Sequence, residues 1–137
     1  MLIFLGGGGA ARRGTLRRMT QMNRIVGGFG ECSAARHLVG QGLTLLERNW
    51  RSPGGELDLV LRDGANLVIC EVKTRRGADF GLPVEAVRPD KVRRLRRLAA
   101  QWLRSTRRFR PRDIRFDVVS VALRERGPRV EHLARAF

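Results

Sequence analysis

The stretch GELDLVLRDGANLVICEVKT, residues 55–74, decides the fold, because it reads as two strand-like runs joined by a tight turn. Polar and apolar residues alternate in both runs, as is typical of strands whose two faces meet different surroundings. The turn Asp63-Gly64-Ala65-Asn66 suits a two-residue hairpin loop with glycine in its first position. The stretch therefore predicts an antiparallel hairpin in which Asp63 pairs with Asn66.

This register also predicts which charged side chains meet across the hairpin. Asp58 is expected directly opposite Glu71, and Glu56 directly opposite Lys73. Side chains in such pairs have Cβ atoms about 5 Å apart. Residues two apart on a strand share a face, so three leucines are expected on the side opposite to the acids. These are Leu57, Leu59 and Leu61.

Carboxylates as close as Asp58 and Glu71 repel each other unless they share a proton or hold a cation between them. Their hard oxygen atoms suit Mg²⁺ or Mn²⁺, and Lys73 is near enough to orient or deprotonate a water molecule. The plainer alternative is a solvated hairpin face with a Glu56–Lys73 ion pair. Ile69 shares the face of Glu71, and apolar residues alternate with it, as in a central strand. That neighbourhood favours the metal site.

The rest of the chain supplies the elements around the hairpin. We expect helices at 29–40 and 89–105, and strands at 43–51, 56–62, 66–74, 114–123 and 129–133. This α-β-β-β-α-β-β order predicts an α/β fold, a mixed β-sheet flanked by helices. Residues 1–27 are expected to be a disordered tail rich in glycine and arginine, and residues 28–137 the single domain.

The charge balance points to nucleic acid as the partner, most simply DNA. Lys and Arg number 28 against 13 acids, a net charge of +15, and such a field attracts polyanions. An anionic membrane is the competing partner, but no apolar run approaches the roughly 18 residues of a membrane span. The apolar start at 1–5 is too short for a signal-peptide core, which predicts a cytoplasmic protein.

Some residue types suggest a role by their rarity or position. Lys73 and Lys91 are the only lysines, and arginine is a poor substitute for a compact catalytic ammonium. The arginines of 93–97 suit phosphate contacts, although a solvated helix face would look the same. Trp102 falls on the apolar stripe of that helix and is expected in the core. The cysteines, Cys32 and Cys70, are expected to be small buried residues. The histidines, His37 and His132, lack metal-ligand spacing and are expected to be incidental.

Two motifs carry a resemblance to a known family. Gly55-Glu56-Leu57-Asp58, followed by Cys70-Glu71-Val72-Lys73-Thr74-Arg75, resembles the D…ExK signature of the PD-(D/E)XK nuclease superfamily. Over residues 27–137 the chain is similar to the YraN-like family of uncharacterised bacterial proteins, related in fold to Holliday-junction resolvases. Further stretches support the resemblance: Gly30-Glu31, Arg48-Asn49-Trp50-Arg51, Phe80-Gly81-Leu82-Pro83, Lys91, Arg115-Phe116-Asp117-Val118-Val119 and Ala136-Phe137. Leu57 stands where the signature's proline would be.

The resemblance implies a restriction-endonuclease-like core and a set of site residues. Asp58, Glu71 and the Val72 carbonyl would bind the metal, and Lys73 would be the catalytic lysine. Glu31 matches a further acidic ligand on the first helix, although alone it also suits an acid favoured by the helix dipole. Glu56 is an auxiliary acid beside the motif. Arginines and one lysine near these positions are the expected nucleic-acid contacts: Arg48, Arg51, Arg75, Lys91, Arg94 and Arg97.

Three functions remain open from the sequence. The first is a divalent-metal-dependent endonuclease that hydrolyses DNA phosphodiesters, with branched DNA as the substrate that the resemblance implies. A homodimer would suit such an enzyme, since it would make paired cuts. The second is a nucleic-acid-binding protein that keeps the nuclease fold without catalysis. The third is an interaction module whose arginines bind an acidic protein.

Overall fold

The computed structural model of the protein describes residues 27–76, 88–107 and 109–137. A first helix, described over residues 27–40, precedes all the strands. The other elements are β1 (Thr44–Ser52), β2 (Gly55–Asp63), β3 (Asn66–Arg76), α2 (Pro89–Thr106), β4 (Asp113–Leu123) and β5 (Arg129–Leu133). The predicted order of elements is therefore confirmed. The predicted tail, apart from residue 27, and the 80–83 stretch lie outside the described residues.

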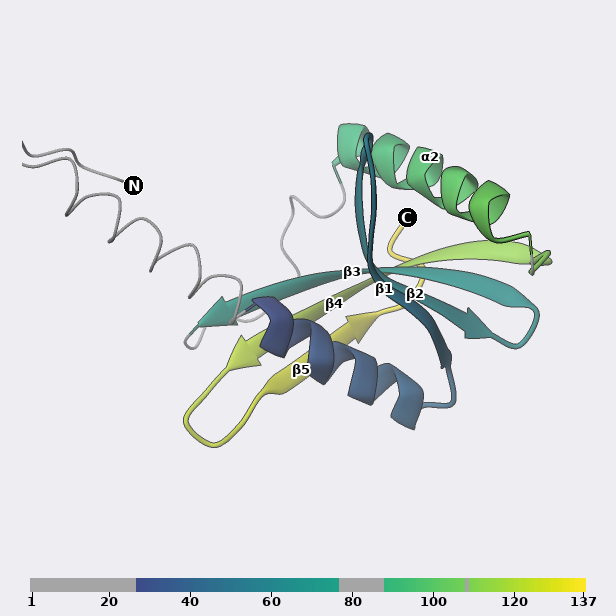
Figure 1. Cartoon of the computed structure of the whole chain (residues 1–137). Coiled ribbons are helices and arrows are strands. Elements are labelled where there is room, and N and C mark those ends of the chain that lie inside the picture. The colour runs from purple at the N-terminus through teal and green to yellow at the C-terminus, as the bar shows by residue number, and fades with distance from the viewer. Residues whose placement is uncertain (1–26, 77–87, 108) are drawn as a thin grey trace, which may run out of the picture.

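The strands form one mixed sheet in the order β1-β2-β3-β4-β5. β3 and β4 run parallel, and every other neighbouring pair is antiparallel. A parallel pair needs a crossover connection, and α2 lies in that connection. The result is the predicted α/β fold, with the first helix and α2 on opposite sides of the sheet (Figure 1).

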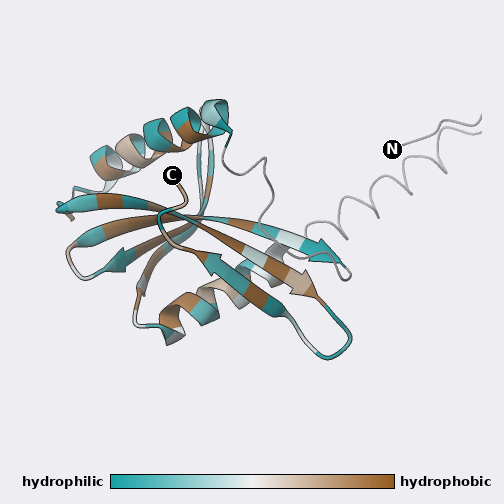
Figure 2. Ribbon diagram, turned by 180° about the vertical axis from the view of Figure 1, so that it is seen from behind, coloured by the Kyte–Doolittle hydropathy of each residue, from teal (hydrophilic) through white to brown (hydrophobic). Residues whose placement is uncertain are grey.

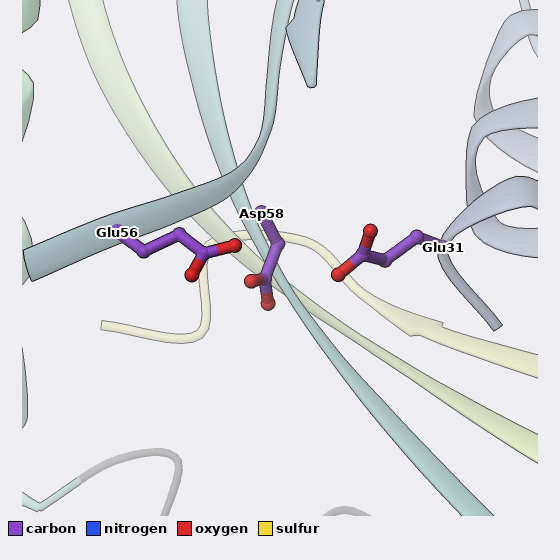
Figure 3. Close-up of side chains that lie close together, drawn as sticks. All are labelled: Glu31, Glu56 and Asp58. Carbon is purple, nitrogen blue, oxygen red and sulfur yellow. The ribbon is translucent and has the colours of Figure 1, made fainter. Parts of the chain in front are cut away.

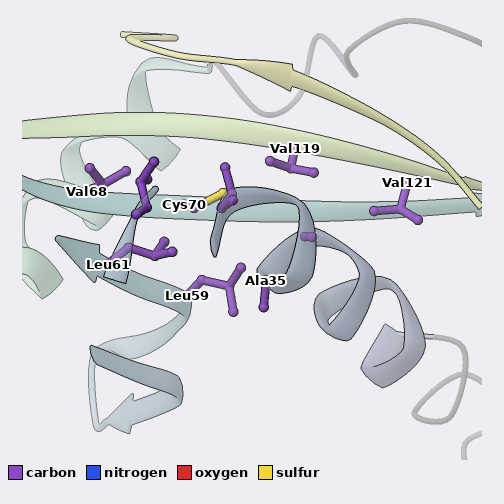
Figure 4. Close-up of a cluster of buried hydrophobic side chains, with 10 residues drawn as sticks. Ala35, Leu59, Leu61, Val68, Cys70, Val119 and Val121 are labelled. Atoms are coloured by element: carbon purple, nitrogen blue, oxygen red, sulfur yellow. The ribbon is translucent and has the colours of Figure 1, made fainter. Parts of the chain in front are cut away.

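Two apolar clusters hold the helices against the sheet. The first helix contributes Ala34, Ala35 and Leu38 to a cluster with β2, β3 and β4 side chains such as Leu59 and Cys70 (Figure 4). On the opposite face, α2 buries a stripe against a second cluster, and its buried residues are Leu95, Leu98, Ala99 and Trp102. Hydrophobic and hydrophilic bands accordingly alternate along strands and helices (Figure 2). Trp102 lies in the core, as predicted.

The β2–β3 hairpin has the predicted register near its turn. Asp63 pairs with Asn66, and the pairing continues to Leu59 opposite Cys70. Assigned pairing ends there, so the predicted Asp58–Glu71 and Glu56–Lys73 pairs are not part of the described ladder. Beyond this point the outer part of the β1–β2 hairpin leaves the plane of the sheet and stands beside α2 (Figure 1). We call the place where β2 leaves β3 the strand fork.

The strand fork also corrects one expectation about faces. Leu59 and Leu61 pack under the first helix, but Leu57 packs with the α2 cluster. The expectation that all three leucines share a face was wrong, because β2 turns between Leu57 and Leu59. Asn49 on β1 has a left-handed φ of 52°, and neither it nor Asp58 has a partner in the β1–β2 register. A left-handed residue at an irregular position bends a strand, and asparagine tolerates that conformation well.

Asp117 on β4 is fully buried and is surrounded by hydrogen-bond donors. Arg115 donates from Nε and a terminal nitrogen over 2.9 and 3.0 Å, and the backbone N–H of Arg135 donates over 3.1 Å. His132 Nε2 lies 2.7 Å from the same carboxylate. The expectation that His132 is incidental was therefore wrong, because it closes the contact between β5 and a buried acid that needs partners.

The chain end is fixed beside this network. The Ala136 N–H donates to the Phe116 carbonyl over 2.8 Å, and the Phe137 ring stacks on the Phe116 ring at 5.3 Å. Cys70 is buried as expected, but Cys32 is exposed, and an Arg48 N–H lies 3.2 Å from its sulfur. The expectation for Cys32 was wrong, because its side chain lies at an exposed position beside Arg48 of β1 and outside the core cluster. Within the described residues, no helix is long and apolar enough to cross a membrane.

Candidate metal centre

Three acidic side chains meet at the strand fork. Glu31 comes from the first helix, whereas Glu56 and Asp58 come from β2. One carboxylate oxygen from each lies within 4.8 Å of the other two. In Figure 3, Glu56 and Glu31 point toward Asp58 from opposite sides. All three are only partly buried, so an ion from solvent can reach them.

Asp58 is at the centre of the group. Its Oδ2 accepts a hydrogen bond from the Val72 N–H over 2.9 Å, which ties the outer part of β2 to β3. Burial and the nearby charge of Glu71 raise the pKa of Asp58 to about 7, although the Val72 hydrogen bond acts the other way. The carboxylate therefore has too little positive charge nearby to offset its desolvation.

Glu31 reaches the group because the first helix approaches β3 closely. A Cβ on Gly30 would overlap the Thr74 hydroxyl, so the backbone contact at Gly30 depends on glycine. Asn49 on β1 is a side-chain hydrogen-bond partner of Glu31. Burial raises the pKa of Glu31, and the charges of Glu56 and Glu71 add to that rise, while Asn49 opposes it.

A second group of charges lies beside the acids, on the α2 side of β3. Lys91 Nζ lies 2.6 Å from Glu71 Oε1, and Lys73 Nζ lies 3.5 Å from the same oxygen. Burial, followed by the neighbouring Lys91, lowers the pKa of Lys73. Burial also acts to lower the pKa of Lys91, but the contact with Glu71 outweighs it and leaves the pKa above its ordinary value.

The predicted site residues are thus divided between two adjoining groups. Glu31, Glu56 and Asp58 form the acidic group, whereas Glu71 is held by the two lysines. The Glu56–Lys73 ion pair of the plainer alternative is not formed, since Glu56 pairs with Arg51 at 3.5 Å and Lys73 with Glu71. Val72 enters the site through its N–H. Glu71 still contributes to the rise in the Asp58 pKa, so the groups share one field.

Sequence reasoning missed two residues of this site. Lys91 was expected at a nucleic-acid surface, but its side chain is only 15% exposed and contacts Glu71. Its rarity as one of two lysines was the available signal. Asn49 was quoted only as part of a motif, and its hydrogen bond to Glu31 depends on a strand irregularity that no local pattern specifies.

The residues predicted to contact nucleic acid differ in how far they are exposed to solvent. Arg48, Arg51, Arg94 and Arg97 are exposed, and Arg75 is half-buried on β3. Arg94 reaches the turn between β1 and β2, where its Cδ would lie 3.7 Å from a Cβ built on Gly55. Arg94 thus lies beside the outer part of the β1–β2 hairpin.

The chemistry of the donor set fits a divalent cation. Carboxylates within 4.8 Å of one another provide hard oxygen ligands from separate elements, as Mg²⁺ and Mn²⁺ require. The raised pKa values of Asp58 and Glu31 indicate negative charge that the described protein atoms do not neutralise. A cation at the acidic group would remove that unfavourable repulsion.

The mixed sheet with a helix on each face, and the acids and lysine at its fork, define a restriction-endonuclease-like α/β protein of the PD-(D/E)XK type. Residues 30–121 match the model of the Uncharacterised protein family UPF0102, and the chain belongs to that family. This confirms the resemblance to the YraN-like proteins.

Relatives match over most of their length. The chain is 55% identical over 109 residues to a UPF0102 protein of Nocardioides sp. (strain ATCC BAA-499 / JS614), covering 80% of this chain and 87% of the relative. It is 57% identical over 113 residues to one of Frankia alni, covering 82% and 93%. For one of Streptomyces coelicolor, the identity is 54% over 109 residues, covering 78% and 84%.

Proposed function

We propose that this protein is a divalent-metal-dependent endonuclease that hydrolyses DNA phosphodiesters in the cytoplasm. The observation that carries the proposal is the acidic group Glu31, Glu56 and Asp58, adjoining a carboxylate that two lysines contact. The net charge of +15 supplies the attraction for a polyanion. Branched DNA is the substrate class that the resolvase-like resemblance favours, and a homodimer would provide paired cuts.

Each side chain has a role in this proposal. Asp58 and Glu31, with Glu56 and Glu71 beside them, would hold Mg²⁺ or Mn²⁺. The bound ion would acidify a water molecule and stabilise charge on the phosphoryl group and the leaving oxygen. Lys73 has a lowered pKa, so its Nζ can accept a proton from the attacking water or donate hydrogen bonds to a phosphoryl oxygen.

Lys91 is a positioning residue in this scheme. Its contact of 2.6 Å with Glu71 fixes the position of that carboxylate. Replacing Lys91 by Met should leave Glu71 with Lys73 alone. We expect weaker metal binding and slower cleavage, but unchanged affinity for DNA in the absence of metal. If the variant loses affinity for DNA without metal by as much as it loses cleavage, Lys91 would instead be a phosphate contact.

The decisive experiment uses purified protein with Mn²⁺ or Mg²⁺ and a panel of linear, flapped and four-way DNA, with matched RNA. Asp58→Ala and Lys73→Ala should abolish cleavage while retaining the fold. Glu125→Ala is the matched control, since Glu125 is an exposed acid in the turn between β4 and β5, away from the site. Cleavage that persists in both site variants would reject the assignment.

One observation favours a second candidate, a nucleic-acid-binding protein without catalysis. Glu71 is already neutralised by lysines and is absent from the described group of three metal-binding acids. Binding without cleavage across the whole panel, with either metal, would support this candidate. Weak nucleic-acid binding that does not change with salt concentration would favour an acidic protein as the partner.

A further inference from the structure

A hollow lies at the C-terminal end of α2, at the opposite end of that helix from Lys91. It has a volume of about 800 Å³ and is formed where α2 ends and the chain enters β4. Lys91 and Arg107, the residue that caps α2, are sixteen positions apart, which corresponds to about 24 Å at 1.5 Å per residue. The hollow is therefore separate from the candidate metal centre, and the proposed reaction does not use it.

The floor of this hollow is apolar and its rim is cationic. Leu103, Phe109 and Ile114 line it and pack against the α2 core cluster. The rim consists of exposed arginines, namely Arg104, Arg107, Arg110 and Arg112. The volume lies within the range of about 300–1,000 Å³ that small-ligand sites occupy. An apolar surface surrounded by guanidinium groups matches a ligand with a flat apolar part and phosphates.

The acid in the lining does not change this charge balance. Asp113 accepts a hydrogen bond from the Ile114 N–H over 2.9 Å and lies 3.4 Å from an Arg135 nitrogen. The guanidinium of the exposed Arg62 lies 5.1 Å from the centre of the Phe109 ring. That contact fixes one face of the ring. The hollow therefore combines a positioned aromatic side chain with an excess of positive charge.

A row of arginines runs along the exposed face of α2 toward the hollow. Arg93, Arg97 and Arg104 recur at helical spacing and are exposed on the face opposite the core. A smaller hollow of about 420 Å³ lies along this row, lined by Asp90, Arg93, Arg96 and Arg97. Positive charge thus extends along the whole length of the helix.

We propose that the 800 Å³ hollow binds a nucleotide of the same nucleic-acid strand whose phosphodiester lies at the candidate metal centre. The inference rests on the proposed function and adds a second point of attachment. A strand with the duplex spacing of 3.4 Å per nucleotide needs about seven nucleotides to span the 24 Å. The base contacts the apolar floor, and the arginines contact the flanking phosphates.

The test measures affinity against length. Labelled single-stranded DNA of 5 and 20 nucleotides is titrated with full-length protein in EDTA, with anisotropy as the readout. The variant is Arg110→Glu with Arg112→Glu, two exposed rim residues. The matched control, Arg36→Glu with Arg126→Glu, makes the same charge change at exposed positions away from α2. Thermal melts establish that both variants fold.

The rim variant should weaken binding of the 20-mer at least tenfold and leave binding of the 5-mer within twofold. Its plot of log K against log salt should be shallower by about 1.4, the value for two lost phosphate contacts on a single strand. The control should stay within threefold of the wild type at both lengths. Equal loss at both lengths, or equal loss in the control, would overturn the proposal.

A free nucleotide offers the same chemistry as a strand, so a second titration separates the two sources. AMP and ADP are added to wild type and the rim variant. Saturable binding that the variant abolishes, without a length effect on DNA, would overturn the strand proposal in favour of a free nucleotide. If the rim variant loses affinity for the 20-mer only, but the wild type cleaves no DNA, the hollow is supported as a binding site and the nuclease function is rejected. If the wild type cleaves DNA but the rim variant shows no dependence on length, the nuclease function is supported and the proposal for the hollow is rejected.

Discussion

Two aspartates of the sheet, the half-buried Asp58 on β2 and the buried Asp117 on β4, have opposite surroundings. Asp117 has no exposed surface and is contacted by Arg115, His132 and the backbone of Arg135. Asp58 has one backbone donor and faces other carboxylates, which helps to raise its pKa to about 7. One acid is satisfied by the protein itself, whereas the other is left with negative neighbours. The comparison separates an acid that holds the fold together from one that suits a ligand.

The largest effect should come from removing the satisfied acid. Asp117→Ala leaves Arg115, whose side chain is only 11% exposed, with Asp63 as its remaining described acidic partner. Breaking a buried ion pair in this way costs about 3–5 kcal/mol. We expect urea denaturation to show a loss of that size in the free energy of unfolding. Asp113→Ala, the exposed control, should cost about 0.5 kcal/mol. A similar loss in both variants would contradict the structural role of Asp117.

Gly30→Ala should have the next largest effect, because the new Cβ overlaps Thr74. Overpacking of this kind costs about 1–3 kcal/mol. It should also displace Glu31 and weaken Mn²⁺ binding, measured by calorimetry. Gly28→Ala is the matched control, since a Cβ there meets nothing within 4 Å. Adding Thr74→Gly to Gly30→Ala should restore most of both properties. Failure of this rescue would show that the contact with Thr74 is not the cause.

The comparison also shows what the sequence could and could not predict. Alternation and the Gly64 turn were enough for the hairpin register near Asp63 and for the order of elements. The D…ExK spacing located Asp58 and Glu71. The strand fork was missed, because it depends on the left-handed backbone at Asn49 and on packing of the hairpin against α2. For the same reason Leu57 was assigned to the wrong face.

The third prediction concerns Asp58. Replacing it should raise the free energy of unfolding, whereas replacing Asp117 should lower it. Asp58→Asn keeps an oxygen that can accept the Val72 N–H but removes a charge placed among other acids. Without metal at pH 8, we expect the free energy of unfolding to rise by about 1 kcal/mol. Saturating Mn²⁺ should raise the melting temperature of the wild type but not of Asp58→Asn. A variant less stable than the metal-free wild type would contradict this interpretation of Asp58.

The smallest and most specific effect is a dependence of stability on pH. The unfolded Asp58 loses its proton near the ordinary value of 3.8, whereas the folded Asp58 keeps it until about pH 7. Between these values the folded state holds more protons, so the stability of the metal-free protein falls as pH rises. Subtracting the profile of Asp58→Asn isolates this contribution, whose slope should be negative and smaller than the limit for one proton, about 1.4 kcal/mol per pH unit. The proposed Mn²⁺ would bind the ionised carboxylate, so its affinity should instead increase over the same range and level off above pH 7. A flat difference between the two metal-free profiles would mean that Asp58 ionises as freely in the folded protein as in the unfolded chain. The distinction from Asp117 would then lie in the number of partners alone.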